Sequence, residues 1–176
     1  MESDDTNLSQ RLVGQPLPAV RLPSTTDEIV DLTLISAGRT VIYCYPRTSE
    51  TGKPAPTDWD LIPGARGCTP QACTFRDHYK ELKALGTSVF GLSTQSTVYQ
   101  REMSTRLHLP FRVLSDEQLT FAGALCLPMF VVDRMQLIGR LTIIARGGAI
   151  EVVLYPVLQP QESANDVIAW LKAHPL

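Results

Sequence analysis

Residues 41–45 of this chain read VIYCY, a nearly continuous apolar run with the length of one β-strand. A strand that is apolar at successive positions, rather than at every second one, is typical of the middle of a sheet covered on both faces. The run is therefore predicted to be a core strand.

A helix and a second strand are predicted after this first strand. In residues 69–85, apolar side chains recur at intervals of four, three and three, at Phe75, Tyr79, Leu82 and Leu85. This spacing indicates an amphipathic helix with one buried stripe, and Gly86 is a typical helix stop. Residues 87–93 (TSVFGLS) have the composition of a strand. A strand, a helix and a strand in this order predict parallel pairing with a right-handed crossover.

The later segments continue this alternation. Helices are expected over residues 98–107 and 118–125, with a short strand near 111–114 between them. Residues 137–144 and 149–155 are apolar and β-branched, and two consecutive glycines between them suit a hairpin turn. The patterns together predict an α/β fold in which helices flank a central mixed sheet.

We expect residues 1–176 to form a single domain, because 176 residues with 44% hydrophobic content suit one core. Residues 1–13, which begin with a polar and acidic stretch, are expected to be an N-terminal arm. Ser163, with Asp166 three residues later, resembles the N-terminal cap of a closing helix.

Residues 47–67 do not fit a compact connection. They contain three prolines and three glycines, and they exceed the usual loop of about four to six residues. Because Trp59, Leu61 and Ile62 give the segment apolar groups to bury, we interpret it as an ordered loop rather than a disordered insertion.

Charge and hydropathy argue against several function classes. A net charge of −2 provides no broad positive field for nucleic acid or for an anionic membrane. The apolar stretches are far shorter than the roughly 20 residues that span a bilayer, and the polar start does not resemble a signal peptide. We therefore expect a cytoplasmic protein without nucleic-acid or membrane partners.

Four cysteines are too few for a disulfide scaffold in a chain of this length, so a reducing compartment is implied and any disulfide is expected to be catalytic. Cys44 lies in the predicted core strand and Cys126 lies between two leucines, so both are interpreted as small buried hydrophobic residues. The histidines have no evident acidic partner and are given surface or structural roles: His78, His108 and His174.

Cys68 and Cys73 lie at the start of the predicted amphipathic helix, within the sequence GCTPQACTFRD of residues 67–77. Unpaired amide groups and the positive end of the helix dipole stabilise a thiolate at such a position. Pro70 is suited to a first helical turn. Cys68 is therefore placed to act as a nucleophile.

Cys73 follows Cys68 by five residues, which puts the two Cα atoms about 8 to 9 Å apart in an intact helix. A disulfide tolerates about 7 Å, so closing this pair requires the first helical turn to unwind. The bond would close a very short loop and would stabilise the folded chain little. This geometry favours a redox pair that cycles with a conformational change.

Other interpretations of the pair are weaker or stay open. A zinc site typically has ligands separated by two to four residues, whereas Cys68, Cys73 and His78 are spread around the helix, so no metal is expected. A thioredoxin-type oxidoreductase would have a C-x-x-C motif, which this sequence does not contain. Two unrelated thiols on one helix stay open as an alternative, because short motifs give false matches.

A wider set of segments carries a family resemblance: residues 43–46, 67–69, 72–77, 91–96 and 109–116. Together they resemble the bacterioferritin comigratory protein or peroxiredoxin Q branch of the peroxiredoxins, over most of the chain. The resemblance implies a thioredoxin-like fold in which the first cysteine is peroxidatic and a cysteine five residues on resolves it. It also implies an arginine on a later strand that supports the thiolate, and Arg140 is identified with that arginine.

By this resemblance, the chain is expected to reduce hydrogen peroxide and organic hydroperoxides in antioxidant defence, without a cofactor. Its catalytic residues would be Cys68, Cys73 and Arg140, and thioredoxin or a glutaredoxin-like protein would reduce the disulfide. The chain would be a monomer or a homodimer. A redox-sensing regulatory protein that uses the same pair is the main alternative, and a catalytically silent binding module is the third.

The sequence departs from the family pattern just before Cys68. The family usually has a threonine three residues before its peroxidatic cysteine, where this chain has Ala65. If Pro46 is the family's active-site proline, residues 47–67 are an insertion, and Thr48 is the nearest hydroxyl that could replace the threonine. Arg66 is interpreted as a solvated loop arginine.

Overall fold

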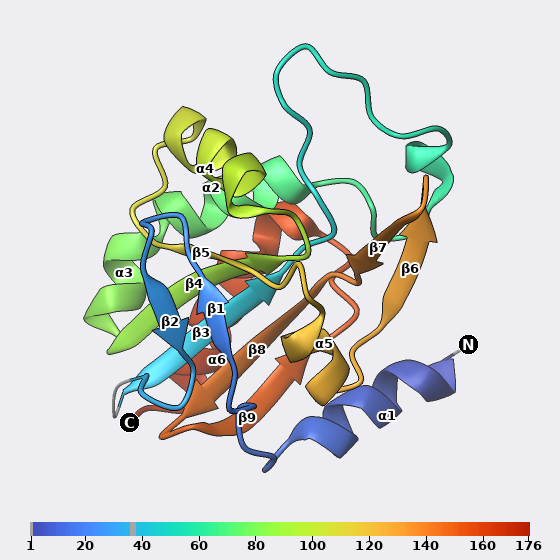
Figure 1. Cartoon of the computed structure of the whole chain (residues 1–176). Coiled ribbons are helices and arrows are strands. Elements are labelled where there is room, and N and C mark those ends of the chain that lie inside the picture. The colour runs from blue at the N-terminus through green and yellow to red at the C-terminus, as the bar shows by residue number, and fades with distance from the viewer. Residues whose placement is uncertain (1, 36–37) are drawn as a thin grey trace.

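The computed structural model describes residues 2–35 and 38–176, with side chains in the first helix described from Asn7 onward. In these residues a five-stranded mixed sheet has the order β5-β4-β3-β8-β9 (Figure 1). Strand β4 is parallel to both β3 and β5, and β8 is antiparallel to β3 and to β9. The strands are β3 (Arg39–Cys44), β4 (Thr87–Ser93), β5 (Val113–Ser115), β8 (Leu141–Arg146) and β9 (Ala149–Leu154).

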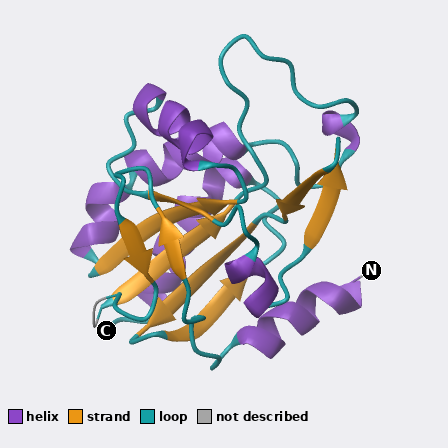
Figure 2. Cartoon of the chain, in the orientation of Figure 1, coloured by secondary structure: helices purple, strands orange, loops and turns teal. Residues whose placement is uncertain are grey.

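Both faces of the sheet are covered (Figure 2). Along β3, Ile42 and Cys44 belong to one buried cluster, whereas Val41 and Tyr43 belong to the other, as the alternation of a strand requires. The first cluster is closed by α1 (Glu2–Leu12), β1 (Arg21–Pro23), β2 (Ile29–Asp31) and α5 (Thr120–Ala124). The second is closed by α2 (Cys68–Asp77), α3 (Tyr79–Ala84), α4 (Thr97–Arg106) and α6 (Ser163–Ala173). The burial of β3 on both sides confirms the predicted core strand.

The N-terminal segment forms α1, whose residues Leu8 and Leu12 are buried in the first cluster. The Gly14 N–H donates to the Ile150 carbonyl at 2.8 Å and connects the end of this helix to β9. The expected arm over residues 1–13 therefore packs on the core from residue 8 onward, while residue 1 lies outside the described residues.

The long loop between β3 and α2 is anchored on a small cluster of its own. It contains one short helix, η1 (Trp59–Leu61), and returns along a hairpin of β6 (Met129–Val132) and β7 (Met135–Ile138) (Figure 1). Trp59 and Ala65 from the loop are buried with Val132 and Leu137 from the hairpin. The expectation that Leu61 is buried is wrong, because its side chain is 78% exposed.

Several predicted elements are confirmed, with shifted ends. The strand over residues 87–93 and its parallel pairing with the core strand are as predicted. The helix predicted over 98–107 is α4, and the glycine-linked hairpin is formed by β8 and β9. The helix expected over 118–125 is shorter, and the strand near 111–114 begins at Val113.

Three local predictions are wrong. The helix over residues 69–85 is interrupted at His78, where φ is −99° and ψ is 6°, and continues as α3. The strand over 137–144 is divided at Gly139 and Arg140, because the Gly139 N–H bonds the Pro128 carbonyl and turns the chain between β7 and β8. Ser163 is no helix cap, since its hydroxyl accepts a hydrogen bond from another helix instead.

Candidate active site

Cys68 is the first residue of α2, and Gly67 positions it there. Gly67 has a φ of 98°, in the left-handed region that favours glycine, and a Cβ at this position would lie 2.7 Å from Pro160 Cγ. Its carbonyl accepts the Gln71 N–H and closes the first helical turn. The Cys68 side chain that follows is 5% exposed. Cys68 is therefore a buried thiol at a helix start.

Arg140 contacts the sulfur of Cys68 directly. Its Nη2 donates to Cys68 Sγ at 3.0 Å, and the guanidinium side chain is buried at 4% exposure. The Cys68 thiol itself donates to the Ala65 carbonyl at 3.6 Å. A buried cation against sulfur stabilises the negative charge of a thiolate.

Neutral acceptors hold the rest of the Arg140 guanidinium. Nε donates to the Gly64 carbonyl at 3.2 Å, and Nη2 also approaches the carbonyls of Ala65 at 3.1 Å and Arg66 at 2.8 Å. Nη1 donates to the Gln71 side-chain carbonyl. The loop before Cys68 and the first turn of α2 thus fix the guanidinium of Arg140. The backbone of Arg140 lies in the interruption between β7 and β8.

Cys73 lies in the same helix, half-buried beside the second hydrophobic cluster. Both Cys68 and Cys73 are free thiols, and the helix between them is continuous. An intact helix keeps their Cα atoms about 8 to 9 Å apart, beyond the reach of a disulfide. The structure therefore represents the reduced arrangement of the pair.

Aromatic side chains form an apolar neighbourhood for the two thiols. Tyr43 stacks on Phe75 of α2 with ring centroids 4.4 Å apart and planes at 7°. Burial raises the pKa of the Tyr43 phenol well above its ordinary value, with smaller contributions from Tyr45 and both thiols, so the phenol stays neutral. A low-dielectric surrounding of this kind strengthens the contact of Arg140 with the sulfur.

Two loop residues considered from the sequence make other contacts. The Thr48 N–H donates to the Gln95 side-chain carbonyl at 2.9 Å, and the Thr48 carbonyl accepts from the Gln95 amide at 3.0 Å. The role of the Thr48 hydroxyl at Cys68 stays a prediction. The Arg66 side chain is exposed and paired with Asp60, as expected for a solvated loop arginine.

Two residues that support Arg140, Gln71 and Ser163, were not predicted from the sequence. Gln71 is fully buried, accepts from Arg140 through its carbonyl and donates through its amide to Ser163 Oγ at 3.2 Å. A polar residue three positions after a candidate nucleophile lies on the same helix face, and this signal could have identified Gln71. Nothing local identifies Ser163, which lies in α6.

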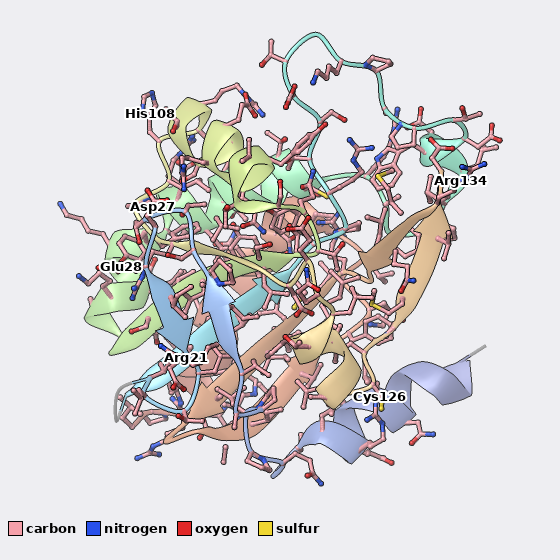
Figure 3. The ribbon with its side chains drawn as sticks, in the orientation of Figure 1. Arg21, Asp27, Glu28, His108, Cys126 and Arg134 are labelled. Atoms are coloured by element: carbon pink, nitrogen blue, oxygen red, sulfur yellow. The ribbon has the colours of Figure 1, made fainter. Side chains whose placement is uncertain are left out.

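The two remaining cysteines differ in their exposure to solvent. Cys44 is fully buried, which confirms the expected core position, and burial raises the pKa of its thiol. Cys126 is exposed beside α1 (Figure 3), so the expectation of burial is wrong. The left-handed backbone there, with φ at 47°, ends α5, and the carbonyls of residues 125 and 126 accept hydrogen bonds from the Arg11 guanidinium.

Within the described part of the chain, no three or more His, Cys, Asp or Glu side chains lie together as a metal site would require.

Among the described helices, none has the length and apolar character needed to cross a membrane.

Comparison with known sequences identifies the family of this chain. The family model described as Redoxin matches residues 12–168. A chloroplastic peroxiredoxin Q of Arabidopsis thaliana is 27% identical over 161 residues, which cover 91% of this chain and 67% of the relative. A putative peroxiredoxin bcp of Coxiella burnetii is 32% identical over 108 residues, 61% of this chain and 62% of the relative.

Solved structures show the same thioredoxin-like fold. Peroxidoxin BcpB of Mycobacterium tuberculosis has a TM-score of 0.74 at 24% identity, covering 93% of this chain and 98% of that one. Peroxiredoxin Q of Xanthomonas campestris has a TM-score of 0.71 at 22% identity, with the same coverage. With the family model matching most of its length, the chain belongs to the Redoxin family, as a peroxiredoxin of the peroxiredoxin Q and bacterioferritin comigratory protein branch of thiol peroxidases.

Proposed function

We propose that this protein is a two-cysteine peroxidase in which Cys68 reacts with a hydroperoxide and Cys73 resolves the product. The observation that carries the proposal is the 3.0 Å hydrogen bond from Arg140 Nη2 to Cys68 Sγ at the start of α2. The helix start and the guanidinium both favour negative charge on this sulfur. Neither feature is present at Cys44 or Cys126.

In the first step, the Cys68 thiolate attacks the terminal oxygen of the hydroperoxide. An S–O bond forms while the O–O bond breaks, and the leaving oxygen takes up a proton and departs as water or an alcohol. Arg140 stabilises the charge that develops on this oxygen; removing such a donor typically costs about 10²- to 10³-fold in rate. The product is a Cys68 sulfenic acid.

In the second step, the Cys73 thiolate attacks the sulfenic sulfur, an S–S bond forms and the hydroxyl departs as water after protonation. Because an intact α2 holds the two residues too far apart, the first turn of the helix unwinds before this attack. An external dithiol then reduces the disulfide and is itself oxidised. Thioredoxin or a glutaredoxin-like protein in a reducing compartment such as the cytoplasm would supply it.

The substrates we propose are hydrogen peroxide and organic hydroperoxides. One protein of similar fold, the Xanthomonas campestris bacterioferritin comigratory protein, is described by its alkyl peroxide reduction activity. Consumption of such peroxides would give this protein a role in antioxidant defence.

A coupled assay tests the proposal. The wild-type chain should consume many equivalents of peroxide with thioredoxin, thioredoxin reductase and NADPH, and Cys68→Ser should consume none while keeping its circular dichroism spectrum. Cys73→Ser should consume about one equivalent and then accumulate sulfenic or over-oxidised Cys68, detected by mass spectrometry. Single-equivalent consumption by the wild type would instead indicate a redox sensor, and normal turnover by Cys73→Ser would require another resolving thiol.

A further inference from the structure

A chain of hydrogen bonds links α6 to the sulfur of Cys68. Arg140 Nη2 donates to Cys68 Sγ at 3.0 Å, and Arg140 Nη1 donates to the Gln71 side-chain carbonyl. The Gln71 amide nitrogen donates in turn to Ser163 Oγ at 3.2 Å. Ser163 is the first residue of α6 and takes no part in the mechanism above. It is connected to the thiol through two intervening side chains.

The direction of these hydrogen bonds makes Ser163 an acceptor. A guanidinium has only donors, so Gln71 must turn its carbonyl toward Arg140 and its amide N–H groups toward Ser163. Gln71 is 0% exposed, which leaves its N–H groups dependent on acceptors within the protein. Without the Ser163 oxygen a buried donor would be left unpaired, and such groups are costly. The orientation of Gln71 that fixes the guanidinium therefore depends on the Ser163 hydroxyl.

The Ser163 hydroxyl has no capping role in its own helix. Helix α6 begins without a side-chain cap, and Ser163 is 3% exposed. A cavity of about 530 Å³ borders Ser163 and also Thr142 of β8, whose buried hydroxyl has no hydrogen-bond partner among the described residues. The two hydroxyls thus border the same cavity and differ in the bond to Gln71. Thr142 is therefore a matched control for the effect of the Ser163 hydroxyl.

The segment before α6 also holds the other end of the same helical turn. Gly67 packs against Pro160, and the Gln71 N–H closes the first turn of α2 on the Gly67 carbonyl. Gly67 and Gln71 are both held from this side, and Cys68 lies between them. In the mechanism proposed above, this turn unwinds before the disulfide forms, so Gln71 then leaves its partners. The support from Ser163 thus acts in the peroxide step and not in the resolving step.

We propose that Ser163 is a positioning residue of the peroxide step and acts on Cys68 through Gln71 and Arg140. The inference rests on the proposed peroxidase function and adds a residue to it. Ser163 acts neither on the sulfur nor on the peroxide itself. Its hydroxyl keeps the Gln71 carbonyl on Arg140, and this keeps the guanidinium directed at the sulfur and at the leaving oxygen. The bonds that form and break at Cys68 are those given above.

Substitutions at position 163 test the proposal in the complete protein. We expect Ser163→Ala to lower the second-order rate of Cys68 oxidation by hydrogen peroxide roughly 2- to 10-fold, the range for one neutral hydrogen bond. Ser163→Thr keeps the hydroxyl, and its extra methyl group can enter the adjacent cavity, so the wild-type rate should be retained. Ser163→Val has nearly the same shape as Ser163→Thr without the hydroxyl, and it should match Ser163→Ala. Thr142→Val, which also removes a buried hydroxyl, should leave the rate unchanged.

The resolving step separates positioning from general damage to the fold. Stopped-flow fluorescence follows the oxidation of Cys68 and the formation of the disulfide as successive phases. Ser163→Ala should slow the first phase and leave the second at least as fast, because the first turn of α2 unwinds before the second phase. Equal slowing of both phases would assign Ser163 a structural role and overturn the proposal.

A double-mutant cycle tests the route through Gln71. Gln71→Leu removes the link between Ser163 and Arg140, so adding Ser163→Ala to this variant should have little further effect on the peroxide rate. Effects that multiply in the double variant would mean that Ser163 acts by another route, and the assignment would be wrong.

A measurement without peroxide separates this proposal from the peroxidase proposal. The Nε–H NMR signal of Arg140, assigned by its absence in Arg140→Lys, reports whether the guanidinium is fixed. In the reduced protein, Ser163→Ala should broaden this signal and speed its exchange with water, whereas Thr142→Val should not. This result would support the positioning role even if no peroxide were consumed. An unchanged signal and a wild-type peroxide rate in Ser163→Ala and Ser163→Val, at a wild-type Tm, would overturn it.

Discussion

The single residue Arg140 combines a buried positive charge with partners that do not neutralise it. Three backbone carbonyls and the Gln71 amide fix the guanidinium, and no carboxylate is among these partners. The positive charge of the guanidinium, 3.0 Å from the Cys68 sulfur, is therefore not offset by a neighbouring carboxylate. A lysine could supply the positive charge, but its ammonium group could not donate hydrogen bonds to all of these acceptors, which lie in several directions around the guanidinium.

We expect Arg140→Ala to lower the second-order rate of Cys68 with hydrogen peroxide by about 100-fold, because the leaving oxygen loses its charged donor. Arg140→Lys should recover part of this loss. Stopped-flow measurement of single-turnover oxidation gives the rate, and near-ultraviolet circular dichroism controls for the fold. A wild-type rate in Arg140→Ala would mean that another group stabilises the transition state.

The two cysteines outside the pair should differ strongly in reactivity. Cys44 is fully buried with a raised thiol pKa, whereas Cys126 is exposed. Since only the accessible thiolate reacts, iodoacetamide at pH 8 should alkylate Cys126 and spare Cys44 in the native protein. Peptide mass spectrometry measures both, and denatured protein, in which both should react alike, is the control. Equal native labelling would contradict the placement of these side chains.

At the scale of elements, the start of α2 depends on a contact with the segment before α6. Gly67 packs against Pro160 of η2 (Pro160–Glu162), in a backbone conformation that other residues avoid. The N–H of Gln71 closes the first turn on the Gly67 carbonyl. The turn that carries Cys68 is therefore held by tertiary packing rather than by a side-chain cap.

Gly67→Ala should destabilise the protein by about 1–3 kcal/mol, because it adds both backbone strain and a clash with Pro160. Gly52→Ala is a matched control, since Gly52 also has a positive φ, 78°, but nothing lies within 4 Å of its Cβ position. Urea unfolding of both variants isolates the contribution of the clash. If the two variants lose the same stability, the contact with Pro160 is unimportant.

Oxidation should loosen this element selectively. We expect faster amide exchange over residues 69–74 and in the 47–67 loop of the disulfide form, and unchanged exchange in residues 41–45 and 89–93, which lie in β3 and β4 and just beyond β3. Hydrogen exchange with mass spectrometry compares the two forms, with the disulfide confirmed by mass. Equal protection of the helix start in both forms would refute unwinding.

The elements also show where sequence patterns fail. Strands β3 and β4 are buried, and they could be predicted from a short apolar run and from strand-like composition. The β6–β7 hairpin was missed, because its turn residues Asp133 and Arg134 take left-handed φ values of 46° and 65° without the glycine that normally marks such a turn. Arg134 is labelled at the tip of this hairpin in Figure 3.

At the scale of the whole molecule, the site joins segments that are distant in sequence. The positions of Cys68 and Cys73 at a helix start could be predicted from a few adjacent residues, and Arg140 from family resemblance. The contact of Gln71 with Ser163 joins residues 92 positions apart and depends on how α6 packs against α2. No local pattern specifies such packing, so this support for the arginine became visible only in the folded chain.

The chain also contains a natural optical reporter of its redox state. Of its two tryptophans, Trp59 is buried against Phe130 in the loop that leads to Cys68, with ring centroids 6.4 Å apart. Trp170 lies in α6, stacked on His174 and under Arg39, at the opposite end of β3 from the thiol. If disulfide formation loosens the loop, Trp59 gains water contact and its emission shifts to the red, while Trp170 emission stays constant. Fluorescence of Trp59→Phe, which should show no redox-dependent shift, assigns the signal, so that each catalytic cycle can be followed without an added label.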